Sequence, residues 1–149
     1  KEGLFNMLHH GGGLFGAKVL DLFSGTGNIA YEFGSRGAAH IDCVDQHRGC
    51  VKFIEETALL LDLPINCFQG STMKFLDHHS GAYDFIFADP PYAFEQEELL
   101  ELVSVIFERQ LLSEQGQFIL EHDKDRDFSA HDRWVNSRKF GGSVFSFFE

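Results

Sequence analysis

The sequence predicts an α/β domain with a mostly parallel sheet and helices on both of its faces. Short apolar runs alternate with amphipathic stretches along all 149 residues, and no repeat, low-complexity tract or proline-rich linker divides them. Two of the apolar runs also end in polar loops, GTG and DPPY, as strands do at the ligand-binding edge of such a sheet. We therefore expect a single domain over residues 1–149, with 44% apolar residues to supply its core.

The order of elements follows from the periodicity of the apolar residues. A helix is expected around Leu4, Phe5 and Leu8, which repeat at helical spacing. Strands are predicted at 19–23, 41–45, 65–68, 83–88 and 117–121, and helices between them at 28–35, 46–61, 73–76 and 95–109. A Gly-Gly turn between 134–140 and 143–148 predicts a closing hairpin.

Composition narrows the class of protein. No apolar run approaches the roughly 20 residues that cross a bilayer, and no charged-then-apolar leader opens the chain, so we expect a soluble, cytoplasmic protein. The three cysteines form no CxxC pair, which argues against a disulfide framework and a thiolate zinc site.

The net charge of −11 argues against a nucleic-acid partner. A local basic face could offset it, because five of the twelve basic residues lie close together: Lys124, Arg126, Arg133, Arg138 and Lys139.

The loop after the first strand is a candidate cofactor site. Its glycines allow a tight turn that brings backbone N–H groups close to a ligand. Asp45 follows 20 residues after Gly25, where an acidic side chain accepts hydrogen bonds from ribose hydroxyls; the alternative is a solvated loop residue or a helix cap. The expected cofactor-binding residues are Asp21, Phe23, Ser24, Gly25, Thr26, Gly27, Asn28, Asp45, Gln46, Ser71 and Thr72.

A nicotinamide dehydrogenase is a rival interpretation, because residues 25–30 also satisfy G-x-G-x-x-G/A with an acidic residue downstream. Asp21 within the strand and the DPPY segment have no evident role in hydride transfer. A sulfonium cofactor, in contrast, carries a cation and a free amino acid end, which gives an acidic residue at the strand terminus a purpose.

The DPPY segment, formed by Asp89, Pro90, Pro91 and Tyr92, is the candidate catalytic motif. Its prolines hold a stiff, non-helical backbone. Acceptance of hydrogen bonds by the Asp89 carboxylate and the Pro90 carbonyl would localise the lone pair of a base's exocyclic amine and aim it at a methyl group. Tyr92 offers a ring on which that base can stack. A rigid loop with an aromatic plug is the alternative.

Jointly these motifs resemble the RsmD-like family of class I methyltransferases, which methylate guanine N2 in bacterial small-subunit rRNA. The resemblance rests on EGLFN at 2–6, VLDLFSGTG at 19–27, FIFADPPY at 85–92 and RKFGGSVFSFF at 138–148. It implies a Rossmann-like, seven-stranded sheet with an antiparallel last strand, S-adenosylmethionine as methyl donor, and rRNA or a small-subunit assembly particle as partner. It also implies a basic arm before the first helix, which this sequence lacks. The family usually has an Asp that contacts the adenine amine where this chain has Ser71.

Several alternatives stay open from the sequence. DPPY also occurs in DNA adenine-N6 methylases, and a catalytically silent RNA-binding module is a further possibility. The His9-His10 and His78-His79 pairs do not predict a metal site, because no partner follows at helical spacing. Residues 121–123, EHD, resemble a set of acid-base catalytic groups but are expected to cap the following segment. The Phe-rich tail is expected to form hairpin core rather than a base-stacking platform. We expect a monomer.

Overall fold

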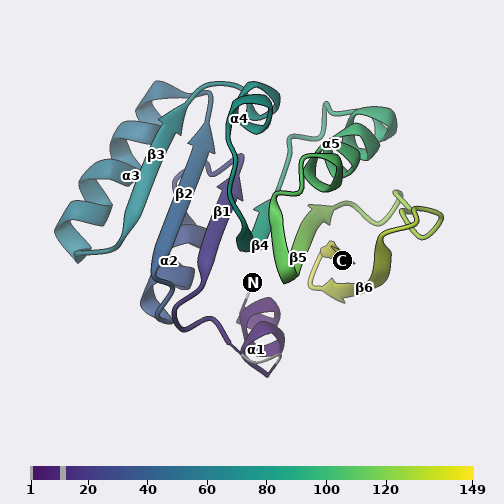
Figure 1. Ribbon diagram of the computed structural model, residues 1–149, viewed down its shortest axis with the longest axis horizontal. Helices are drawn as coiled ribbons and strands as arrows, with labels where there is room; N and C mark the ends of the chain where they lie inside the picture. The colour runs from purple at the N-terminus through teal and green to yellow at the C-terminus, as the bar shows by residue number, and fades with distance from the viewer. Residues whose placement is uncertain (1, 11–12) are drawn as a thin grey trace.

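The computed structural model describes residues 2–10 and 13–149, and its centre is one seven-stranded sheet (Figure 1). The strands lie in the order β3-β2-β1-β4-β5-β7-β6, with bounds β1 (Lys18–Leu22), β2 (His40–Asp45), β3 (Ile65–Gln69), β4 (Tyr83–Ala88), β5 (Leu112–His122), β6 (Trp134–Phe140) and β7 (Ser143–Phe148). Strands β1 to β5 pair in parallel, whereas β7 is antiparallel to both of its neighbours. The predicted fold class is confirmed, including the antiparallel last strand.

Helices cover both faces of the sheet. Their bounds are α1 (Glu2–His10), α2 (Asn28–Ser35), α3 (Arg48–Leu61), α4 (Thr72–His78) and α5 (Gln96–Glu108). Apolar residues of α1, α2 and α3 share one buried cluster with the sheet, and those of α4 and α5 share the other. Within the described ranges, no helix is both long and apolar enough to cross a membrane.

Phenylalanines supply much of both buried clusters. Phe33 of α2 packs edge-on against Phe5 of α1, with ring centroids 4.9 Å apart. On the hairpin, Phe145 and Phe147 belong to one cluster and Phe148 to the other. The Phe-rich tail is therefore hairpin core, as expected from its strand-like pattern.

The predicted elements match the observed ones closely, with one clear difference in β5. This strand begins at Leu112, ahead of the predicted start at residue 117. Leu112 pairs with Tyr83 across a bulge, and only then does Gln117 pair with Phe85. Polar residues at 113–115 interrupt the apolar run in the bulge, so the sequence pattern marked only the part of β5 buried on both faces.

The strand order changes direction between β1 and β4. From β1 the chain moves outward to β2 and β3, then returns to place β4 on the other side of β1. Ligands of open α/β sheets bind at such a switch point, beyond the carboxyl ends of the strands. The loops after β1 and β4, which carry GTG and DPPY, therefore emerge side by side.

Candidate active site at the carboxyl edge of the sheet

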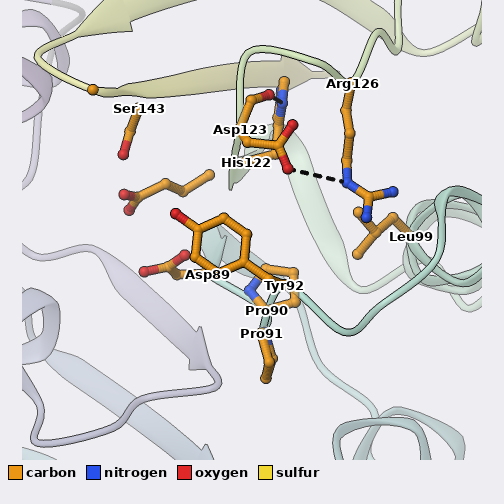
Figure 2. Close-up of a pocket in the computed structure, with 11 residues that line it drawn as sticks. Asp89, Pro90, Pro91, Tyr92, Leu99, His122, Asp123, Arg126 and Ser143 are labelled. Atoms are coloured by element: carbon orange, nitrogen blue, oxygen red, sulfur yellow. Dashed lines mark hydrogen bonds and ion pairs between the residues drawn. The ribbon is translucent and has the colours of Figure 1, made fainter.

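A cavity of about 290 Å³ opens beyond the carboxyl ends of β4 and β5 (Figure 2). It is lined by the DPPY segment, by the end of β5 with the loop that follows, by one residue of α5 and by the turn between β6 and β7: Asp89, Pro90, Pro91, Tyr92, Leu99, Glu121, His122, Asp123, Arg126, Gly142 and Ser143. The whole predicted catalytic motif therefore lies in one concave site. Such cavities are where proteins of this fold class bind small molecules and nucleotide bases.

The DPPY segment leaves the sheet from its most buried part. Ala88 is fully buried and pairs with both Leu22 of β1 and Leu120 of β5. Asp89 follows at the surface of the cavity, and the Tyr92 ring is 88% exposed. Figure 2 shows Asp89 and Tyr92 projecting into the same space. A planar base could therefore stack on Tyr92 while its amine meets Asp89.

Two contacts hold the loop that carries this motif. The Phe94 ring packs edge-on against the Phe23 ring, with centroids 5.2 Å apart. The Arg126 guanidinium donates a hydrogen bond to the Phe94 carbonyl and lies 3.5 Å from an oxygen of Asp123. Phe23 follows β1 and Arg126 follows β5, so the DPPY loop is attached to both neighbouring strands. The side chain of Phe23 joins the two motif loops, and its contact with a cofactor stays a prediction.

The loop after β1 keeps most of its polar groups within the protein. Ser24 N–H donates to the Val44 carbonyl at 3.0 Å, and the Ser24 hydroxyl donates to the Asp21 carbonyl at 2.6 Å. Gly27 N–H donates to the Ser24 carbonyl at 2.9 Å. The N–H groups of Ser24 and Gly27 are therefore bonded within the protein, and the approach of this loop to a cofactor stays a prediction. Those bonds fix the shape of the loop.

The backbone of Gly25 borders open space on one side of this loop. Its φ of +57° lies in the left-handed region, and a Cβ added there would meet nothing within 4 Å. At Gly27, in contrast, a Cβ would come within 2.9 Å of Tyr31 and Ile54. Gly27 is thus needed for packing of the loop on α2 and α3, whereas Gly25 leaves room for a ligand to approach the backbone.

Asp45 connects the loops after β1 and β2. One carboxylate oxygen accepts a hydrogen bond from Gly25 N–H and the other from His47 N–H, both at 2.8 Å. A carboxylate has about four lone-pair positions, so both oxygens can still accept a ribose hydroxyl. The cap of α3 is His47, whose ring accepts a hydrogen bond from Cys50 N–H at 3.2 Å. Asp45 is therefore a loop anchor whose remaining acceptor positions suit a ribose.

The loop after β3 adjoins Asp45 through the backbone. Gly70 N–H donates to the Asp45 carbonyl at 3.0 Å. Ser71 caps α4 by accepting a hydrogen bond from Lys74 N–H at 3.1 Å, which leaves its own O–H as a donor. Thr72, the first residue of α4, is buried, whereas Gln46 is exposed. The predicted cofactor residues thus follow the strand order β3-β2-β1 along one edge, next to the cavity of the DPPY segment.

Residues 121–123 were only partly understood from the sequence. Asp123 does cap a turn, by accepting a hydrogen bond from Asp125 N–H at 2.9 Å. Glu121, His122 and Asp123 nevertheless all line the cavity, together with Ser143 of the closing hairpin. The rule that identified GTG and DPPY, polar residues at the carboxyl ends of parallel strands, applies equally to β5 and could have indicated Glu121.

His122 belongs to a chain of hydrogen bonds that joins β5 to the hairpin. Its Nδ1 lies 2.7 Å from the Asp123 carbonyl, and its Nε2 lies 2.7 Å from the hydroxyl of the fully buried Ser146. Ser146 contacts the Ser137 hydroxyl at 2.8 Å, to which Trp134 Nε1–H donates.

Both ends of this chain have a fixed hydrogen-bonding role, because a carbonyl only accepts and an indole N–H only donates. A neutral His122 fits this series of bonds: Trp134 donates to Ser137, Ser137 to Ser146 and Ser146 to Nε2, while Nδ1–H donates to the Asp123 carbonyl. Burial lowers the pKa of His122, which favours the neutral ring, although the Asp123 carbonyl opposes this by favouring the protonated ring.

One of the five clustered basic residues lies apart from the cavity. Arg133 stacks on the Phe107 ring, with its guanidinium carbon 4.9 Å from the centroid, and lines a groove with Leu112 and Glu149 at the opposite end of β5. Arg126, in contrast, lines the cavity. Arg138 and Lys139 are exposed on the edge strand β6, where the register through β7 places them level with Glu121 and His122.

Histidines 78 and 79 are used within their own helix. Nδ1 of His78 lies 2.9 Å from the Lys74 carbonyl, and the His79 ring stacks on Phe75 with centroids 3.7 Å apart. The side chains of His9 and His10 lie outside the described residues. Among the residues that are described, no three or more His, Cys, Asp and Glu side chains come together as a metal site.

Comparison with known proteins identifies relatives along the entire chain. Residues 1–149 match the family described as Conserved hypothetical protein 95. A Bacillus subtilis protein named "Putative rRNA methyltransferase YlbH" is 32% identical over 132 residues, which cover 84% of this chain and 68% of the relative. "Ribosomal RNA small subunit methyltransferase D" of Buchnera aphidicola is 30% identical over 74 residues, covering 49% of this chain and 38% of the relative.

A solved structure shows the same architecture. The chain superimposes on a conserved hypothetical protein of Streptococcus pyogenes with a TM-score of 0.85 and 26% sequence identity. The match covers 98% of this chain and 92% of the Streptococcus protein. The fold described above, including the hairpin that completes the cavity, therefore has a close structural counterpart.

Proposed function

The chain belongs to the Conserved hypothetical protein 95 family, and we propose that it transfers a methyl group from S-adenosylmethionine to the exocyclic N2 of a guanine in small-subunit rRNA. Membership confirms the RsmD-like resemblance of its motifs. The names of two relatives, an rRNA methyltransferase and a small-subunit rRNA methyltransferase, support rRNA as the substrate. The observation that carries the proposal is the position of Asp89 in a cavity directly beside the loop of Gly25.

The donor site fits S-adenosylmethionine in three respects. The open space over Gly25 admits a ligand close to the backbone, Asp45 has acceptor positions for ribose hydroxyls, and the Ser71 hydroxyl can donate to a ring nitrogen of adenine. The carboxylates of Asp21 and Asp45, near the ends of β1 and β2, suit a ligand with a positive charge. When bound, this cofactor supplies an electrophilic methyl group on a sulfonium sulfur.

The acceptor site prepares the amine rather than deprotonating it. The exocyclic amine of guanine is a weak nucleophile, because its lone pair is delocalised into the ring. Asp89 and the Pro90 carbonyl accept its hydrogen bonds, which localises the lone pair and directs it towards the donor loop. Tyr92 stacks on the base and fixes its plane. Catalysis then comes from alignment and preorganised charge, with no strong base. The amine is cationic once it is methylated and releases its extra proton to water.

The decisive experiment is Asp89→Ala, with Asp132→Ala as a matched exposed control. We expect single-turnover methyl transfer to small-subunit rRNA or its assembly particles to fall on the order of 100-fold or more. The dissociation constant for S-adenosylmethionine, measured by calorimetry, should change only a few-fold. Wild-type transfer by Asp89→Ala would remove the motif from catalysis.

The two rival functions give different results in the same experiments. An NAD-linked oxidoreductase would bind NADH and not S-adenosylmethionine in parallel titrations. A DNA adenine-N6 methyltransferase would yield N6-methyladenine from a DNA substrate, which mass spectrometry of the digested product separates from N2-methylguanine. Family membership favours neither rival, and the guanine product is the specific outcome of the proposal.

A further inference from the structure

We propose that Glu121 recognises the N1–H of the target guanine and thereby makes the cavity selective for guanine among bases that carry an exocyclic amine. The inference rests on the proposed function, because it takes the amine of the base to lie at Asp89. It adds a specificity-determining residue to a site in which the motifs themselves identify only the amine and the stacking surface.

The strand register places Glu121 beside Asp89. Ala88, the last residue of β4, pairs in parallel with Leu120 of β5, so Asp89 and Glu121 are the residues that directly follow this pair. Neighbouring strands lie about 4.8 Å apart. Both residues line the cavity, but Glu121 is only 8% exposed, whereas Asp89 is exposed. Two carboxylates therefore stand side by side, with Glu121 the deeper one.

This pair of acceptors matches the edge of guanine. Guanine has two adjacent donors, the N2 amine and N1–H, and an ionised carboxylate only accepts. With the amine at Asp89, N1–H is the next donor along the ring and faces the neighbouring strand. Adenine and 2,6-diaminopurine present a lone pair at N1 instead, which a carboxylate repels. A site built to bond a particular hydrogen rejects analogues that lack it.

Asp123 lies next to Glu121 and shapes the wall of the cavity. One of its oxygens accepts a hydrogen bond from Asp125 N–H at 2.9 Å, and the other lies 3.5 Å from the Arg126 guanidinium. Arg126 in turn donates a hydrogen bond to the Phe94 carbonyl. These contacts connect the loop after β5, beside Glu121, to the DPPY loop that carries Asp89.

The test uses 2,6-diaminopurine, which keeps the 2-amino group of guanine but has no N1–H. Binding of guanosine 5′-monophosphate, adenosine 5′-monophosphate and 2,6-diaminopurine riboside 5′-monophosphate is measured by NMR titration of the cofactor-loaded protein. Methyl transfer is measured with rRNA in which the methylated guanine, once mapped, is replaced by 2,6-diaminopurine. The variant is Glu121→Gln, and Glu114→Gln, exposed near the other end of the same strand, is the matched control.

For the wild type and the control, we expect about 10- to 150-fold preference for guanine over 2,6-diaminopurine, as for a hydrogen bond to a charged acceptor. In Glu121→Gln the preference should shrink to about threefold or less, because a Gln amide can donate to the bare N1 as well as accept from N1–H. The wild-type preference is itself a test if the variant does not fold.

The outcomes separate the inference from the proposed function. Equal use of guanine and 2,6-diaminopurine by the wild type, or an unchanged preference in a folded Glu121→Gln, overturns the role of Glu121 while methylation of guanine N2 stands. Selective binding of the guanine nucleotide without methyl transfer to any rRNA supports Glu121 and contradicts the proposed function. Methylation of adenine in place of guanine overturns both.

Discussion

Replacement of Asp45 by Ala tests how the cofactor loop is held and what it binds. The substitution removes two hydrogen bonds of 2.8 Å, from Gly25 N–H and His47 N–H, to one carboxylate. A hydrogen bond to a charged group contributes about 1.5–3 kcal/mol, and the His47 bond, which is exposed, contributes less. We therefore expect a loss of about 2–3 kcal/mol in the free energy of unfolding. For a domain of this size that corresponds to a decrease of roughly 4–12 °C in melting temperature.

The same variant should also bind S-adenosylmethionine more weakly. Loss of the ribose hydrogen bonds predicts a further reduction of about 10- to 150-fold in affinity. Thermal and urea unfolding without cofactor measure the first effect, and calorimetry at a temperature where the variant is folded measures the second. Asp45→Asn is the control, because its amide oxygen can still accept one of the two backbone N–H groups.

Each result has a distinct meaning. A variant that is less stable but binds the cofactor like the wild type would make Asp45 a structural anchor and remove it from the donor site. An unchanged unfolding midpoint would refute the argument that these two bonds stabilise the loop.

Two further predictions concern the acceptor cavity and the hairpin behind it. Tyr92→Ala should weaken binding of the RNA substrate by about 5- to 150-fold, the contribution of one stacked base, whereas Tyr92→Phe should retain nearly all of it; equal losses in both variants, measured by RNA titration, would show that the hydroxyl matters and not the ring. Because the pKa of His122 is lower in the folded protein, the unfolded chain binds a proton first as the pH falls below about 6.5, so stability is full above that pH and declines below it. Urea unfolding between pH 7 and pH 5 should therefore show a steeper loss for the wild type than for His122→Gln, and parallel losses would contradict the sign of this shift.

The strands of the parallel part of the fold could be predicted because they are continuous apolar runs with polar residues at their ends. The same rule located Asp45 and Asp89 at one edge of the sheet. This rule could not predict the hydrogen bonds between the loops that follow the strands. That Gly25 N–H binds Asp45, or that Ser24 bridges Asp21 and Val44, depends on how loops from different strands meet, and a single sequence carries no pattern for such contacts.

The cavity residues outside the DPPY segment were harder to predict than the DPPY segment itself. Glu121 follows an apolar run just as Asp89 does, but no motif marks it. The contribution of Ser143 follows only from the antiparallel direction of β7, which brings the start of that strand to the carboxyl ends of the others.

The position of β7 has a consequence for how the chain reaches its native state. The last strand of the chain lies between β5 and β6 and makes all the described strand pairing that attaches β6 to the sheet. During synthesis, β6 is therefore translated before the strand with which it pairs. Phe145, Phe147 and Phe148 complete the two buried clusters only once β7 is in place. Removal of residues 143–148 would therefore take away the described pairing that attaches β6 to the sheet and the contribution of Ser143 to the cavity.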